Sequence, residues 1–158
     1  MINTMAILLA EYLFVLPILV GGLYFLLQPS EVKKNMIVLS AISLPLTLLL
    51  MFILNQVYDN PRPDVVLDFS PFLESHFFSN GFPSTHATLT TLIAAVMYVF
   101  NRKIGLFLLF ISIFISLARV HLGLHHLIDI IGGTILAIAV TALAQTIIQR
   151  YISPLPQK

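Results

Sequence analysis

The chain has 158 residues, of which 58% are hydrophobic and 9% are charged, and its formal net charge is +1. Because soluble domains carry about 25% charged residues, this composition excludes an ordinary soluble protein and favours one integral membrane domain over residues 1–158. The absence of cysteine excludes disulfide scaffolds and thiol nucleophiles, and the small net charge gives no electrostatic basis for binding nucleic acid.

Five apolar stretches approach the length of about 20 residues that a helix needs to cross a bilayer. They are residues 5–27, 36–57, 84–100, 104–118 and 127–148. The sequence therefore predicts an all-α, multi-pass membrane bundle of five helices, with a sixth possible. We expect the short third and fourth stretches to open onto a polar cavity. The first lacks the basic start of a cleaved signal peptide, so we expect it to remain as a helix.

Lysine and arginine residues predict the orientation of this bundle. Six of the eight occupy three places that share one side of a five-helix protein, the side that the positive-inside rule makes cytoplasmic. They are Lys33, Lys34, Arg102, Lys103, Arg150 and Lys158. The opposite face, which retains Arg62 and Arg119, is therefore expected to point to the periplasm or the outside of the cell membrane.

Most of the ionisable side chains gather on the predicted outer face, beside Arg62 and Arg119. The set comprises His76, His86, His121, His125, His126, Asp59, Asp64, Asp68, Glu74 and Asp129. Charged groups near the membrane that oppose the orientation rule are candidates for function.

The first two polar clusters suit the binding of an anion. In Asn60-Pro61-Arg62-Pro63 the prolines keep Arg62 out of a helix, and an arginine that reaches lipid headgroups is an equal alternative. Residues 81–86 are typical of a helix N-terminus, where the Ser84 hydroxyl would partly serve as a cap and free N–H groups bind anions. Capping does not explain His86, for which the alternative is a buried core histidine.

The third cluster runs from Arg119 to Asp129. His125 and Asp129 are four residues apart and share a face if the segment is helical, so the carboxylate would fix the imidazole tautomer. A structural ion pair is the simpler alternative, and a divalent metal bound by His121, His125 and Asp129 is another. Together, two arginines, a helix N-terminus and a histidine–carboxylate pair favour phosphoryl chemistry on a membrane-borne substrate.

These clusters resemble the three motifs of the type 2 phosphatidic acid phosphatase superfamily, KxxxxxxRP, PSGH and SRxxxxxHxxxD. The resemblance covers residues 50–130 and the closing helix. It departs from the motifs at Asn55, Thr85 and Ala118, which stand for lysine, glycine and serine. The family core commonly has six spans, and the one missing from the five counted here would be N-terminal.

The resemblance implies a role for each matching residue. His125 would be the nucleophile that forms a phosphohistidine, Asp129 would orient it, and His86 would protonate the leaving oxygen. The phosphoryl oxygens would be held by Arg62, Arg119, Ser84 and Thr85. The family needs no metal, so no cofactor is expected.

The chain is similar to bacterial undecaprenyl diphosphate phosphatases of the bacitracin-resistance type in its small size, its outward-facing site and its Glu11-Tyr12 pair. The sequence thus predicts hydrolysis of a polyprenyl diphosphate. Phosphatidylglycerophosphate, phosphatidic acid and lipid A are alternative substrates. A metal-binding or transport protein, and a family member that only binds or flips lipid, are alternative functions.

The aromatic-rich residues 58–82 could guide a lipid tail or simply pack as a loop. Glu11 could pair with an outer-face arginine or reach the interface.

Overall fold

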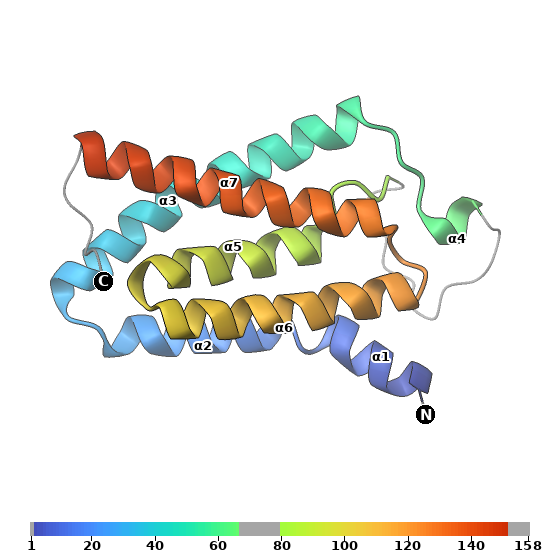
Figure 1. Cartoon of the computed structure of the whole chain (residues 1–158), viewed down its shortest axis with the longest axis horizontal. Coiled ribbons are helices and arrows are strands. Elements are labelled where there is room, and N and C mark those ends of the chain that lie inside the picture. The colour runs from blue at the N-terminus through green and yellow to red at the C-terminus, as the bar shows by residue number, and fades with distance from the viewer. Residues whose placement is uncertain (1, 67–79, 152–158) are drawn as a thin grey trace.

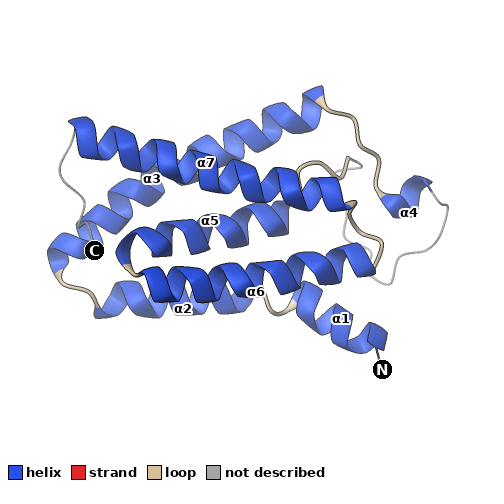
Figure 2. Ribbon diagram, in the orientation of Figure 1, coloured by secondary structure: helices blue, strands red, loops and turns tan. Residues whose placement is uncertain are grey.

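A computed structural model describes residues 2–66 and 80–151 of the chain, and within these ranges the regular structure is helical (Figure 2). An isolated antiparallel bridge joins Pro61 to Asn80. The helices are α1 (Ile2–Glu11), α2 (Val15–Leu27), α3 (Ser30–Val57), α4 (Pro63–Val66), α5 (Thr85–Phe100), α6 (Arg102–His121) and α7 (Leu127–Tyr151). The prediction of an all-α bundle is confirmed.

Helix α5 lies at the centre of the bundle and packs against α2, α3, α6 and α7, while α1 packs against α6 (Figure 1). Its buried face is rich in small side chains, including Ala87, Thr88, Thr91 and Ala94, which let neighbouring helices approach closely. At 16 residues α5 is about 24 Å long, shorter than a bilayer core. The prediction that this stretch is short is confirmed.

The outer surface of the bundle is apolar. Leu19, Phe52, Phe110 and Leu143 each expose more than half of their surface. Four segments are long and apolar enough to cross a membrane: Thr4–Leu27, Ser30–Val57, Arg102–His121 and Leu127–Tyr151. Lipid, rather than water, is the solvent that such a surface requires, which makes the chain a multi-pass membrane protein.

Three predicted boundaries are wrong. The first stretch is broken between Glu11 and Val15, because Pro17 cannot donate to the carbonyl of Leu13, which accepts a shorter-range bond from Leu16 N at 3.0 Å instead. Helix α3 starts six residues early, at Ser30, since its first turn contains the favourable Glu31.

Helix α6 is the third difference, because its 20 residues make it longer than predicted. At its start the Asn101 side chain accepts a hydrogen bond from Ile104 N at 3.1 Å and caps the helix. At its end the helix continues through Arg119 and His121, whose polar side chains do not break helical structure.

Gly105 provides a stability prediction. A Cβ at this position would overlap the backbone Cα and N of Tyr98, where α6 crosses α5. We expect Gly105→Ala to force the two helices apart and to lower the free energy of unfolding by about 1–3 kcal/mol. Thermal unfolding of the purified protein in detergent measures this. Gly22→Ala is the matched control, because its Cβ would meet nothing within 4 Å. Equal melting temperatures for the two variants would contradict the prediction.

One end of the bundle collects the segments that carry the three polar clusters. The last turns of α3 and α6, the first turns of α5 and α7, and helices α1 and α4 all lie at this end (Figure 1). The α2–α3 and α5–α6 connections lie at the other end. Segments more than 100 residues apart are thereby brought to one place, as the contact of Arg119 with Glu11 across 108 residues illustrates.

Candidate active site

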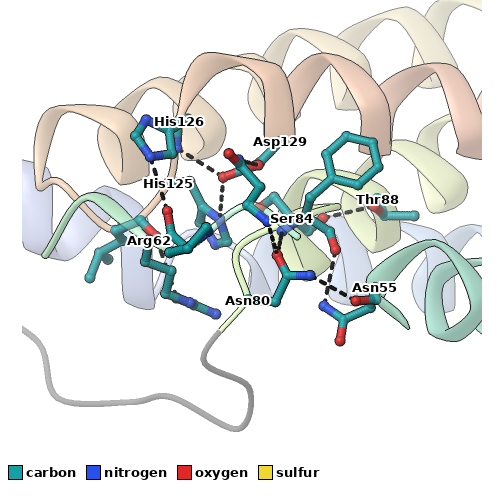
Figure 3. A network of polar contacts seen from close by, with 12 residues as sticks. Asn55, Arg62, Asn80, Ser84, Thr88, His125, His126 and Asp129 are labelled. Atoms are coloured by element: carbon teal, nitrogen blue, oxygen red, sulfur yellow. Dashed lines mark hydrogen bonds and ion pairs between the residues drawn. The ribbon is translucent and has the colours of Figure 1, made fainter. Parts of the chain in front are cut away.

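A buried histidine–carboxylate pair forms the centre of this end. His125 is 3% exposed and Asp129 is fully buried, and His125 Nδ1 lies 3.3 Å from Asp129 Oδ2 (Figure 3). The predicted contact between these residues is present. Since a carboxylate accepts hydrogen bonds, Nδ1 carries the proton and Nε2 holds a free lone pair.

The backbone explains why the pair forms without a continuous helix. Gly123 has a φ of 72°, a left-handed conformation that favours glycine, and it turns the chain after α6. Helix α7 then starts at Leu127, so His125 precedes the helix and Asp129 lies in its first turn. Asp129 Oδ2 accepts a hydrogen bond from His126 N at 2.9 Å, as an acid at the third position of a helix does.

Two asparagines hold the carboxylate and the loops around it. Asn60 Nδ2 donates to Asp129 Oδ1 at 2.6 Å. Asn80 Nδ2 donates to the carbonyls of Asn55 and Tyr58, both at 2.7 Å, and Asn80 Oδ1 accepts from the backbone N–H groups of Asn60 and Phe82, both at 3.1 Å. Asn80 thus ties the end of α3 to the segment that leads into α5 (Figure 3).

Both predicted arginines are buried at this end. Arg62 is 8% exposed, and its Nη1 donates to the carbonyl of Leu124 at 3.4 Å, next to His125. Arg119 is 2% exposed, and its Nη1 lies 3.4 Å from His86 Nε2 and 3.2 Å from Glu11 Oε1. A sequence-based alternative is thereby resolved, because Glu11 pairs with an arginine.

The start of α5 differs in one respect from the predicted helix cap. Ser84 stands at the N-cap position, but its hydroxyl makes no capping bond. Instead, the Ser84 carbonyl accepts from Thr88 N at 2.9 Å and from Thr88 Oγ1 at 2.7 Å. The Ser84 hydroxyl is buried and has no hydrogen-bond partner among the residues that the structure describes. A buried hydroxyl without a partner is suited to a bound ligand.

A small pocket of about 190 Å³ opens beside these groups. It is lined by Leu48, Met51, Phe52, Asn55, Arg62, Asn80, Pro83 and Thr85. Asn55, which stands for the lysine of the first motif, lines the pocket and donates from Nδ2 to the carbonyl of Phe82 at 3.0 Å. The phosphate-binding candidates Arg62 and Thr85 therefore share a pocket with apolar side chains of α3.

The electrostatic environment keeps His125 neutral. Burial is the largest influence and lowers its pKa below the ordinary value of 6.5. The hydrogen bond that His125 donates to Asp129 opposes this shift of the pKa, and the positive charges of Arg62 and Arg119 reinforce it. An unprotonated imidazole beside two cations is the state that a histidine nucleophile requires.

Some of the predicted residues do not join the cluster. His121 is exposed at the end of α6, and no three His, Asp or Glu residues within the described ranges could hold a metal ion together. The metal alternative thus has no ligand set there. His76, Asp68, Glu74 and most of the aromatic residues between 58 and 82 lie outside the described residues.

Sequence reasoning missed three contributors to this end. Asn60 lay inside a recognised cluster without a role, and Asn80 precedes Gly81 in a dipeptide that is typical of turns. Phe14, in the break between α1 and α2, stacks edge-on against the His86 ring with a centroid separation of 5.6 Å. Only the Asn-Gly pair carried a signal that could have been read.

Comparison with known proteins agrees with the motif resemblance. Residues 36–153 match the sequence model of the PAP2 superfamily. The chain is 25% identical over 139 residues to undecaprenyl-diphosphatase BcrC of Bacillus subtilis (strain 168), an alignment that covers 88% of this chain and 71% of that protein. It is 28% identical over 132 residues to a protein of Escherichia coli (strain K12) provisionally named undecaprenyl-diphosphatase YbjG, with coverage of 82% and 65%.

No solved structure matches the chain significantly. The family match extends over well over half of the chain and includes all three clusters. The protein therefore belongs to the PAP2 superfamily, as the three motifs predicted.

Proposed function

We propose that the protein is a membrane-bound lipid phosphatase that removes the terminal phosphate of undecaprenyl diphosphate. The observation that carries this proposal is the buried His125–Asp129 pair beside Arg62, Arg119 and the buried hydroxyl of Ser84, which has no hydrogen-bond partner within residues 2–66 and 80–151. Arginine guanidinium groups and hydroxyl groups donate hydrogen bonds to phosphoryl oxygens, and a neutral imidazole can attack phosphorus. The names of the two relatives support this substrate class.

In the proposed reaction, His125 Nε2 attacks the terminal phosphorus. The N–P bond forms as the bond from phosphorus to the bridging oxygen breaks, and His86 donates a proton to that oxygen. Water then attacks the phosphohistidine while His86 takes a proton from the water. The N–P bond breaks, and inorganic phosphate leaves with His125 restored. Arg62, Arg119, Ser84 and Thr85 hold the phosphoryl oxygens, where positive charge stabilises the transition state.

The setting of the pocket supports a lipid as the substrate. Arg62 and Thr85 lie at its polar side, and Leu48, Met51 and Phe52 of α3 line it as well. Phe52 is 59% exposed on the apolar surface of the bundle. A phosphate bound at the arginine would therefore have its hydrocarbon chain beside the membrane-facing surface of α3.

We propose that the site faces the outside of the cell. Lys33 and Lys34 near the start of α3, Arg102 at the start of α6 and Arg150 near the end of α7 belong to the opposite end of the bundle (Figure 1). Positive charge marks the cytoplasmic end of membrane helices. This distribution supports an extracytoplasmic site.

The decisive experiment is a substrate panel with the purified protein in the presence of a metal chelator. We expect phosphate release from undecaprenyl diphosphate, with weaker release from phosphatidic acid and phosphatidylglycerophosphate. Thr146→Ala, on an exposed face of α7, serves as the control and should retain full activity. If no lipid phosphate in the panel is hydrolysed, or if chelation abolishes release, the proposal fails.

His86 provides a prediction that depends on the leaving group. A diphosphate expels a phosphate, whose second pKa is about 6, whereas a monoester expels a much more basic alkoxide. The monoester therefore needs proton donation far more. We expect His86→Asn to lower kcat/KM for phosphatidic acid, a monoester of the substrate panel, about 10²–10⁴-fold and for the diphosphate clearly less. Steady-state kinetics on both substrates measure the two losses, and equal losses would contradict a role for His86 as the acid.

A further inference from the structure

Glu11 at the end of α1 reaches the site although none of the three motifs includes it. Its Oε1 lies 3.2 Å from Arg119 Nη1, and the same nitrogen is 3.4 Å from His86 Nε2 and from the carbonyl of Ala10. One guanidinium nitrogen is thus shared by a carboxylate from the N-terminal helix and by the proposed general acid.

The packing that brings Glu11 to this place involves small side chains. Ala6 and Ala10 of α1 are buried in one cluster with Ala118, Leu122 and Leu124. Ala118 stands where the third motif has serine, directly before Arg119. Alanines on both helices allow α1 to lie close to α6, and this places the last residue of α1 beside the arginine.

The ion pair between Glu11 and Arg119 balances positive charge at the site. A buried arginine without an anion is costly, and Arg62 and Arg119 are both buried close to His125. The Asp129 carboxylate is already engaged by Asn60, His126 and His125. Within the described residues, Glu11 is the acid that forms an ion pair with Arg119.

The geometry is that of a contact that can open. A single nitrogen–oxygen contact of 3.2 Å is longer than the 2.7–2.9 Å of a strong charge-assisted bond, and it is not the two-pronged pairing that locks an arginine. Glu11 is 27% exposed, whereas Arg119 is 2% exposed. The irregular residues between α1 and α2 follow Glu11 directly. The carboxylate can therefore withdraw while the arginine stays in place.

We infer that Glu11 is a resident counter-ion of the phosphate site, which gives up Arg119 to the substrate phosphate and reclaims it when phosphate leaves. The inference rests on the proposed function. The Glu11 carboxylate and a phosphoryl oxygen compete for the same donor, and the two anions repel each other. Glu11 thereby weakens phosphate binding and promotes product release.

The test is the affinity for inorganic phosphate in Glu11→Gln, which keeps the size of the side chain and removes its charge. We expect the inhibition constant of inorganic phosphate to fall about three- to tenfold and KM for undecaprenyl diphosphate to fall with it. Arg119 should remain in place through its bond to the Ala10 carbonyl. Glu31→Gln, in the first turn of α3 at the other end of the bundle, is the matched control and should leave both constants unchanged.

A rise, rather than a fall, in the inhibition constant of inorganic phosphate and in KM overturns the inference. If Glu11 merely positions Arg119, the inhibition constant and KM rise in Glu11→Gln, and if Glu11 is only a surface charge, neither changes. Glu11→Asp, which lengthens the ion pair, provides a second variant in case the first does not fold, and its inhibition constant should fall less. Wild-type protein that hydrolyses no lipid phosphate would defeat the proposed function instead. The rise in melting temperature with added inorganic phosphate, larger in Glu11→Gln than in wild type, would then still test the counter-ion.

Discussion

Replacing His125 with alanine is expected to reduce phosphate release from undecaprenyl diphosphate by at least about 10⁴-fold. The imidazole is the proposed attacking group, and its neighbours cannot replace it. His126 directs Nε2 to the carbonyl of Pro61 at 3.1 Å, and His86 Nε2 is engaged with Arg119 Nη1 at 3.4 Å. Phosphate release with radiolabelled substrate measures the loss, and a phosphohistidine trapped on wild-type protein by rapid acid-free quenching should be absent from the variant.

A control is needed because the variant removes a buried side chain. His126→Ala is the matched substitution, since it removes the adjacent imidazole, which is more exposed, and leaves the His126 N–H bond to Asp129. We expect it to retain most of the activity. If His125→Ala retains activity within tenfold of wild type while His126→Ala is inactive, the nucleophile has been assigned to the wrong residue.

The five apolar stretches and their order were predictable because hydrophobic length is a local property of the chain, whereas the division of the first stretch into α1 and α2 and the short helix α4 were not predicted. Lipid-facing helices need uninterrupted apolar stretches, and these are visible without knowledge of their neighbours. Boundaries depend on weaker effects. The break before Pro17 and the early start of α3 at Ser30 involve single backbone bonds and single charges, which hydropathy does not register.

The residues of the site were predictable where their spacing has a geometric meaning. His125 and Asp129 are four residues apart, a spacing that predicts a contact across one turn of a helix. The contact forms, although His125 lies in the loop before α7 and only Asp129 lies in the helix. The Asn-Gly pair signals a turn, but the partners of Asn80 could not be predicted, because three of its four hydrogen bonds reach residues 20 to 25 positions away and leave no periodic pattern. The Ser84 hydroxyl was expected to serve partly as a cap of α5 because serine often does, whereas it makes no capping bond there.

Asp129→Asn is expected to lower kcat about 10²–10⁴-fold while the protein stays folded. Both carboxylate oxygens accept hydrogen bonds, Oδ1 from Asn60 and Oδ2 from His126 N and His125. An amide has only one acceptor oxygen, so its NH₂ group must face one of these donors. If it replaces Oδ2, it donates to Nδ1 and shifts the His125 proton to Nε2, the atom that must attack.

If the amide NH₂ instead replaces Oδ1, Asn60 can turn its own amide and present an oxygen, and the correct His125 tautomer survives. The loss of charge remains, since phosphorylated His125 is a cation that Asp129 no longer stabilises.

The variant Asn60→Ala separates the two effects, because it removes the partner of Oδ1 and keeps the carboxylate, so its kcat should fall much less than that of Asp129→Asn. The double variant Asn60→Ala/Asp129→Asn removes the Asn60 side chain, so the orientation of the introduced amide is then determined by His125 and His126 N alone. If kcat of Asp129→Asn stayed within fivefold of wild type, neither tautomer control nor charge stabilisation by Asp129 could be part of the reaction.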